Sequence, residues 1–128
     1  MNGRLTVSGN LMRLAPGQHG IHVHQNGDLA NACAAAGAHF NPAGVNHGAP
    51  TANPHHVGDM GNIRAGNNNV AAVMISNLEI PLSGPNSVLG RAIVVHANPD
   101  DLGLGGTPLS LTTGNSGRRV ACGVIVAA

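Results

Sequence analysis

The stretch His19-Gly20-Ile21-His22-Val23-His24 decides the fold and points to the chemistry. From Gly20 onward it alternates strictly, so Ile21 and Val23 share one face of an extended segment and His22 and His24 share the other. Such alternation predicts a β-strand with an apolar face turned to a core and a histidine-bearing face turned away from it.

Further strands are predicted on both sides of this stretch. They lie at Arg4–Val7, Val70–Ile75, Arg91–His96 and Arg119–Val126. Helical periodicity is not sustained over about ten residues anywhere, so an all-β fold is expected. Two long irregular stretches, 25–60 and 97–117, separate the strands. Loops of that length are rare in a compact domain unless they are functional or cross-linked.

Length and composition exclude several classes of function. The 128 residues suit one domain, 1–128, with a modest core. Six Arg, no Lys and the single aromatic residue Phe40 argue against a nucleic-acid partner, which would need a basic tract or stacking aromatics. Neither a membrane-spanning apolar run of about 20 residues nor a signal-type N-terminus is found. A cytoplasmic location is expected, with chloroplast and peroxisome left open.

Histidine is unusually frequent, with eight residues in the chain. His22 and His24 lie two apart on one strand face, about 6.6 Å along the chain, so both rings could reach one metal at about 2.0 Å. Taken alone, this pair is a weak signal, because two histidines at this spacing are more often surface or network residues than metal ligands.

A second group of candidate ligands lies in the first long stretch: His39, His47, His56 and Asp59. Three imidazoles and one carboxylate suit a closed tetrahedral zinc site. The alternative is a set of solvated loop histidines without a ligand.

His96 ends an apolar strand, where a lone histidine would be a hydrogen-bonded core residue. Together with His22, His24 and His39 it completes four imidazoles, a donor set that suits copper in both oxidation states. His19, on the opposite strand face, is expected to bond backbone near the site, and His55 to be exposed.

Taken together, the motifs closely resemble the copper–zinc superoxide dismutases, and within them the plant-type enzymes. The resemblance covers about residues 4–126 and rests on residues 19–24, 37–42, 47–50, 56–62, 80–84, 90–96, 100–103, 113–115 and 119–123. It implies a Greek-key β-barrel or sandwich of immunoglobulin-like architecture, with copper and zinc as cofactors and superoxide as substrate. It also implies a copper chaperone for loading, and it leaves a homodimer open.

The resemblance assigns roles to individual residues. The implied copper ligands are His22, His24, His39 and His96. The implied zinc ligands are His39, His47, His56 and Asp59, so His39 would bridge the two metals. Asp100 would link His22 to His47, a contact that fixes ring orientation. Arg119 would dock the superoxide anion, and Thr113 would narrow the channel opposite it.

Two cysteines, Cys33 and Cys122, would be read in a cytosolic chain as reduced core thiols. The resemblance implies instead that they form an internal disulfide.

The chain departs from the family at two places. The family's barrel begins with a hairpin before the strand matched by Arg4–Val7, so about six strands with two functional loops are expected here, with an open barrel edge or unusual oligomerisation. The second loop has Leu104, Pro108, Leu109 and Thr112 where charged steering residues are often found, so electrostatic steering should be weaker. A copper-delivery domain of the same fold, or a zinc hydrolase with an open metal position, are the alternative functions.

Overall fold

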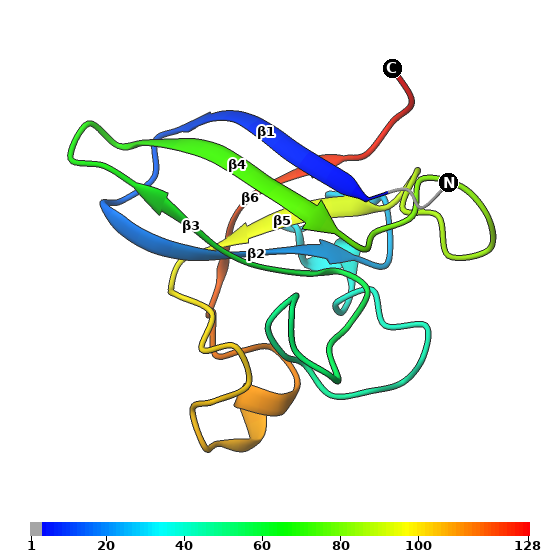
Figure 1. The fold of residues 1–128 in the computed structure, drawn as a ribbon. Helices are drawn as coiled ribbons and strands as arrows, with labels where there is room; N and C mark the ends of the chain where they lie inside the picture. The colour runs from blue at the N-terminus through cyan, green and yellow to red at the C-terminus, as the bar shows by residue number, and fades with distance from the viewer. Residues whose placement is uncertain (1–3) are drawn as a thin grey trace.

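The computed structural model describes residues 4–128, which form one curled antiparallel sheet of six strands in the order β1-β4-β3-β2-β5-β6 (Figure 1). The strands are β1 Leu5–Met12, β2 Gly17–His24, β3 Asp59–Ala65, β4 Val70–Leu78, β5 Ala92–His96 and β6 Arg119–Val124. Strands β2, β3 and β4 are neighbours in the sheet, and β4 lies beside the first strand, β1. The first four strands therefore have a Greek-key order. The all-β prediction and the count of about six strands are confirmed.

Helical structure in the described residues is limited to two 3-10 turns, Ala34–Ala36 and Pro108–Leu111. No helix among them has the length and apolar character that crossing a membrane requires.

Both faces of β2 are buried, for different reasons. Ile21 and Val23 lie in the apolar core, together with Phe40, Met60 and other residues. His22 and His24 on the other face are also buried, although no core covers them. In Figure 1 the two long loops, drawn in teal-green and orange, lie together beyond the β2–β3 part of the sheet. The loops therefore enclose the histidine face of β2.

Strand β3 was not predicted as a strand. Its sequence carries Gly61, with φ +83°, and the partly buried Asn62 in the middle, and both interrupt the expected alternation. The segment forms a strand despite its low β-propensity, because it pairs with β2 on one side and β4 on the other. The same effect extends β1 through Gly9, which pairs with Val73 of β4.

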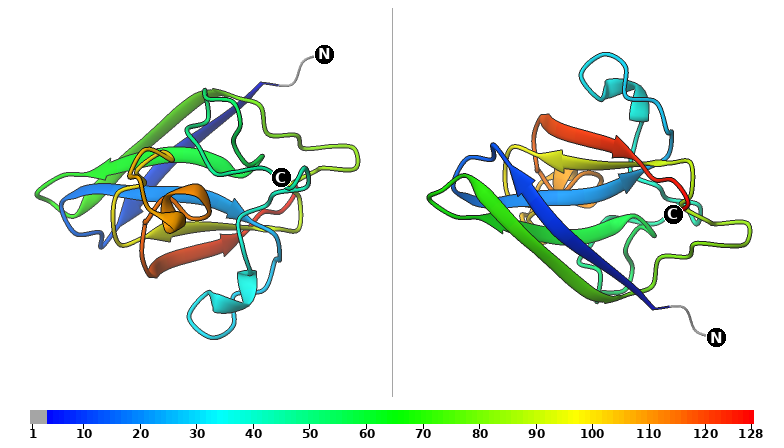
Figure 2. Two further views of the ribbon diagram at one scale, coloured as in Figure 1. Left: turned by 90° about the horizontal axis from the view of Figure 1, so that it is seen from below. Right: turned by 90° about the horizontal axis from the view of Figure 1, so that it is seen from above.

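The sheet does not close on itself within the described residues. Strands β1 and β6 form its two ends and do not pair with each other; Figure 2 shows β4 on the side of the molecule away from β6, with β1 crossing inside it. A cavity of about 330 Å³ opens against the inner face of β1, where Val7, Leu11, Ile21 and Ile93 line it. The expectation of an open barrel edge is confirmed, whereas unusual oligomerisation stays a prediction.

Candidate metal centre

The first cluster consists of four buried imidazoles whose ring nitrogens lie within 4.8 Å of one another: His22, His24, His39 and His96. Strand pairing of β2 with β5 brings the first two near His96 at the end of β5. A single bridge between His24 and His39 carries the loop residue to the same place. The Nε2 atoms of His24 and His96 are 3.3 Å apart, and the His22 and His39 rings stack at 3.9 Å.

The second cluster converges on one carboxylate oxygen. Asp59 Oδ1 lies 2.9 Å from His47 Nδ1, 3.2 Å from His39 Nδ1 and 3.3 Å from His56 Nδ1. The other oxygen of Asp59 is occupied by the backbone N–H groups of Gly48 and His56. This arrangement leaves Oδ1 and three Nδ1 atoms facing one point.

His22 also comes within 4.8 Å of His39, His47 and Asp59, so distance alone would admit it to the second cluster. The ring can serve only one site, because its Nε2 is already bonded to Asp100 and only Nδ1 is left. His56 Nδ1 lies 3.2 Å from His39 Nδ1 and has no part in the first cluster. We therefore group His56 with Asp59 and keep His22 with the first cluster.

Asp100 joins the two clusters. The Nε2–H groups of His22 and His47 each donate to one of its carboxylate oxygens at 2.7 Å, and the Leu102 amide donates to the oxygen shared with His47. Protons fixed on Nε2 leave both Nδ1 lone pairs free for a cation. The contact implied by the resemblance is present in the structure.

Backbone carbonyls orient the other two rings of the first cluster. His24 Nδ1 lies 2.8 Å from the Gly37 carbonyl, and His96 Nδ1 lies 3.0 Å from the Gly117 carbonyl. As donors to these oxygens, both rings keep Nε2 free on the side of the cluster. Neither glycine was identified as a contributor from sequence, since any residue type can offer a carbonyl.

Burial keeps the first cluster uncharged. It lowers the pKa of His22 to about 3, of His24 to about 2 and of His96 to about 4, and it also lowers the pKa of His39. Desolvation disfavours the protonated ring in each case. At neutral pH the four rings are therefore neutral donors.

In the second cluster, hydrogen bonds outweigh burial and favour the charged forms of His47, Asp59 and the neighbouring Asp100. Burial opposes charge there too, but hydrogen bonds to Asp100 and Asp59 raise the pKa of His47 to about 9. Against the same burial, hydrogen bonds from the imidazoles lower the pKa of Asp59 and bring that of Asp100 to about 2. Two carboxylate charges are thus held inside the protein, where a cation would be favourable.

The donors fit two metal ions. Among the described residues, three buried side-chain polar atoms lack a hydrogen-bond partner, and two of them are His22 Nδ1 and His39 Nε2 in the first cluster. Such atoms are costly unless something satisfies them. Four neutral nitrogens suit copper, and three nitrogens with one carboxylate oxygen suit zinc.

An open cavity of about 400 Å³ leads to the first cluster. His24, His39, His96, Thr113 and Arg119 line it, with Leu109, Thr112 and others. Arg119 is held by backbone: its guanidinium donates to the carbonyls of Cys33 at 2.7 Å and Gly37 at 2.6 Å. Arg119 and Thr113 therefore lie where a ligand of the first cluster would enter.

The two cysteines form a disulfide, Cys33–Cys122, as the resemblance implied. The reading as two reduced core thiols is wrong for this structure. The bond ties the loop beside Arg119 to strand β6, because Cys33 lies in that loop and Cys122 in the strand.

The remaining histidines take no part in the clusters. The ring nitrogens of His19 lie 2.8 Å from the His96 carbonyl and 2.7 Å from the Ala15 carbonyl, so the predicted structural role is confirmed. His55 was expected to be exposed but is partly buried, since its Nδ1 turns back to the His56 carbonyl at 2.6 Å.

Gly114 was not singled out for a role by the sequence reasoning. A Cβ at this position, where φ is +72°, would stand 2.5 Å from His47 Nε2 and closer still to Asp100. A glycine is required there for both conformation and space. Gly114 therefore allows the second loop to cover the Asp100 bridge.

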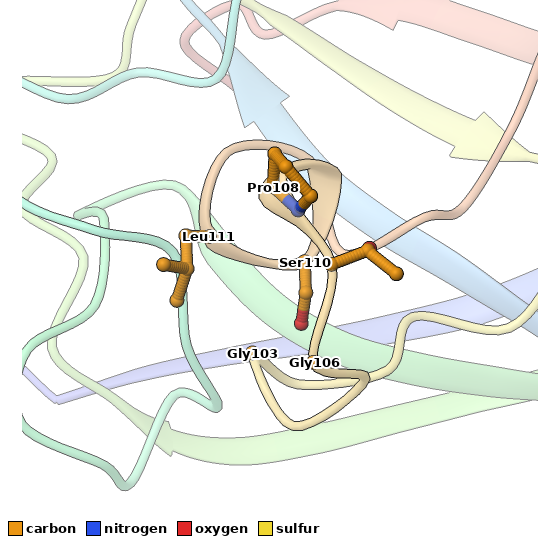
Figure 3. A pocket seen from close by; sticks show the side chains of 6 residues that line it. Gly103, Gly106, Pro108, Ser110 and Leu111 are labelled. Atoms are coloured by element: carbon orange, nitrogen blue, oxygen red, sulfur yellow. The ribbon is translucent and has the colours of Figure 1, made fainter.

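Another cavity, of about 500 Å³, lies in the second loop against the turn Pro108–Leu111 (Figure 3). Its lining is glycine backbone with Thr107, Pro108, Ser110 and Leu111. The Ser110 hydroxyl is already bonded to Asp101 and Gly105. The cavity therefore presents no titratable group and no free nucleophile, and the chemistry belongs to the two clusters.

The comparison with known families agrees with this geometry. The family model described as copper/zinc superoxide dismutase matches residues 1–125, which include both clusters, Arg119 and the disulfide. The match extends over almost the whole chain. The protein therefore belongs to the copper/zinc superoxide dismutase family.

Proposed function

We propose that this chain is an active superoxide dismutase, with copper held by the first cluster and zinc by the second. One observation carries the proposal: the His39 ring faces both clusters. Its Nδ1 lies 3.2 Å from Asp59 Oδ1, while its Nε2 is buried without a partner beside the other imidazoles. A shared imidazole of this kind suits two adjacent cations.

The side chains around the cavity have the properties that the reaction requires. When bound, copper supplies the one-electron chemistry by which two superoxide anions and two protons become oxygen and hydrogen peroxide. Arg119 offers a permanent positive charge and a planar donor group to an anion in the cavity. His39 Nε2 is the atom that can take up and return a proton, since no protein group occupies it. Asp100 keeps His22 and His47 oriented throughout.

The alternative functions have less support. The four donors of the second cluster leave no open position of the kind that a zinc hydrolase needs. A copper-delivery domain would have no use for an arginine at the mouth of the cavity. Family membership supports superoxide as substrate and a homodimer as assembly. A copper chaperone and a cytoplasmic location remain predictions.

The test is superoxide decay after pulse radiolysis, followed with protein loaded with copper and zinc. We expect wild type to give decay that is first order in superoxide, with a rate proportional to protein concentration. The catalytic rate constant should fall about tenfold or more for Arg119→Ala, the loss of one positioned charge. Arg118→Ala, at the exposed neighbouring position, is the matched control and should lose far less. Metal-loaded wild type that does not accelerate superoxide decay above the spontaneous rate would favour the copper-delivery function instead.

A further inference from the structure

Three backbone hydrogen bonds form a closed ring among residues adjacent in sequence to the two clusters. The Val23 N–H donates to the Gly58 carbonyl at 2.9 Å, the Gly58 N–H to the Phe40 carbonyl at 3.1 Å, and the Phe40 N–H to the Val23 carbonyl at 2.8 Å. The three residues are distant in sequence, and each both donates and accepts. We call this arrangement the Val23–Phe40–Gly58 ring.

Every member of the ring is a close chain neighbour of cluster residues. Val23 separates two imidazoles of β2, Phe40 directly follows the shared imidazole, and Gly58 directly precedes the carboxylate of the second cluster. Five of the seven cluster residues therefore lie within two positions of a ring member. They are His22, His24, His39, His56 and Asp59. Val23 thus adjoins donors of the first cluster, Gly58 adjoins donors of the second, and Phe40 adjoins the imidazole that both share, so the ring links the backbone of the two clusters.

Gly58 is required by space at this position. A Cβ there would stand 2.2 Å from the Val23 carbonyl oxygen and 3.3 Å from the Phe40 nitrogen. The nearest obstacle is backbone, which cannot swing aside as a side chain can. Any residue larger than glycine must therefore separate Gly58 from Val23 and open the ring.

Arg91 clamps the ring from the adjoining side. Its guanidinium carbon lies 3.8 Å from the centroid of the Phe40 ring, and Phe40 is 5% exposed. The same side chain donates to the Gln25 carbonyl at 2.9 Å, and the Gln25 N–H in turn donates to the Ala38 carbonyl at 3.0 Å. Arg91 thus stacks on the residue after His39 and bonds the residue after His24.

We propose that the Val23–Phe40–Gly58 ring, clamped by Arg91, holds the two metal clusters in register, and that Gly58 and Arg91 are positioning residues for both metals. The inference rests on the metal sites of the proposed function, but it does not require that superoxide be the substrate. Neither residue offers a ligand atom to either cluster, so both act through the backbone that carries the ligands.

Gly58→Ala tests the ring, with Gly123→Ala as its matched control. Gly123 lies in β6 without a positive φ, and a Cβ there meets nothing within 4 Å. Copper and zinc affinities are measured by competition with a chromogenic chelator, together with the visible spectrum of the copper-loaded protein and amide exchange at Val23 and Phe40. We expect Gly58→Ala to bind both metals about 10–100-fold more weakly, the size of effect seen when ligand-orienting contacts are lost. Its copper spectrum should shift and both amides should exchange faster, whereas Gly123→Ala should match the wild type.

The inference is overturned if Gly58→Ala exchanges these amides faster yet keeps both metal affinities within about threefold of the control. Should Gly58→Ala not fold, Arg91→Gln decides instead, compared with Arg64→Gln at an exposed site of β3. We expect a weaker metal affinity and a shifted copper spectrum for Arg91→Gln but not for Arg64→Gln. Arg91→Lys should recover part of the wild-type affinity. Equal affinities and spectra in the two glutamine variants would refute the positioning role of Arg91. Wild type that binds both metals without consuming superoxide contradicts the proposed function alone.

Discussion

Loss of the Cys33–Cys122 disulfide should remove a large part of the stability of the fold. The two cysteines are 89 positions apart in the chain. For a loop of that length, the chain-entropy relation gives about 15.5 cal/mol/K, or about 4.6 kcal/mol at 25 °C. Domains of this size are stable by only about 5–15 kcal/mol in total. The double variant Cys33→Ser/Cys122→Ser should therefore be close to the limit of folding.

Loss of the disulfide should also disturb Arg119 in the cavity that leads to the first cluster. Cys33 has φ +73°, a conformation that non-glycine residues rarely adopt. Its carbonyl accepts a hydrogen bond from the Arg119 guanidinium. Without the covalent tie, this segment can relax toward ordinary backbone angles and withdraw an acceptor from Arg119. Misplacement by about 1 Å can cost up to about 10²-fold in rate, so kcat/KM for superoxide should fall along with stability.

Urea denaturation of the metal-free double variant, compared with oxidised wild type, measures the first effect. Wild type reduced with dithiothreitol provides a second comparison without any substitution. The m-value should change little if folding remains two-state, so that the midpoint reports the free energy of unfolding. A loss below about 1.5 kcal/mol, far under the chain-entropy value, would refute the argument from loop closure. Unchanged kcat/KM in a folded double variant would refute the link to Arg119.

Other expectations concern charge, protons and the open edge. Asp100→Asn cannot accept hydrogen bonds from His22 and His47 at once, so one ring should turn its proton to Nδ1 and at least one metal should bind about 10–100-fold more weakly by chelator competition. Unchanged affinities for both metals would contradict this. The free energy of unfolding of the metal-free protein should rise from pH 4 to 6.5, because the unfolded chain binds protons that the three imidazoles with pKa values of about 2 to 4 refuse when folded. It should fall again between pH 6.5 and 9, because folded His47, with its pKa raised to about 9, keeps a proton that the unfolded chain has lost. A profile without this maximum would contradict these pKa shifts. The salt dependence of kcat/KM should be shallow, because Arg119 is the one Asp, Glu, Lys or Arg side chain among the described residues that line the cavity; a slope as steep as that of fully charged relatives would argue otherwise. Hydrogen exchange should be fastest in β1 and β6, or the protein should associate through these edges, whereas a monodisperse monomer with fully protected outer strands would exclude both.

Sequence reasoning was most successful where chemistry demands a particular side chain. Only a few residue types bind copper or zinc. The spacing of His22, His24 and the loop histidines was therefore enough to identify most of the candidate metal ligands. The alternation around Ile21 fixed the orientation of β2 in the same way. The resemblance then added Asp100 and Arg119, for which spacing alone gave no argument.

What sequence reasoning missed is mostly backbone. Strand β3 contains Gly61 and Asn62, which local preferences assign to turns, and its neighbours in the sheet override those preferences. The carbonyls of Gly37 and Gly117 orient two imidazoles, yet every residue carries a carbonyl and none is marked in the sequence. A glycine whose function is the absent Cβ, such as Gly58, likewise has no distinguishing neighbour pattern.

The open edge and the metal centre can coexist because β2 separates them. Ile21 faces the cavity beside β1, while His22, the next residue, faces the clusters on the other side of the strand. The contacts that hold the cluster residues in place come from β3, which carries Asp59 and bonds Asp100 through Asn62, and from the disulfide on β6, Arg91 before β5 and the two long loops. Strand β1 contributes none of these contacts. A sheet that lacks closure between β1 and β6 therefore loses stability at its rim before it loses the arrangement of its ligands.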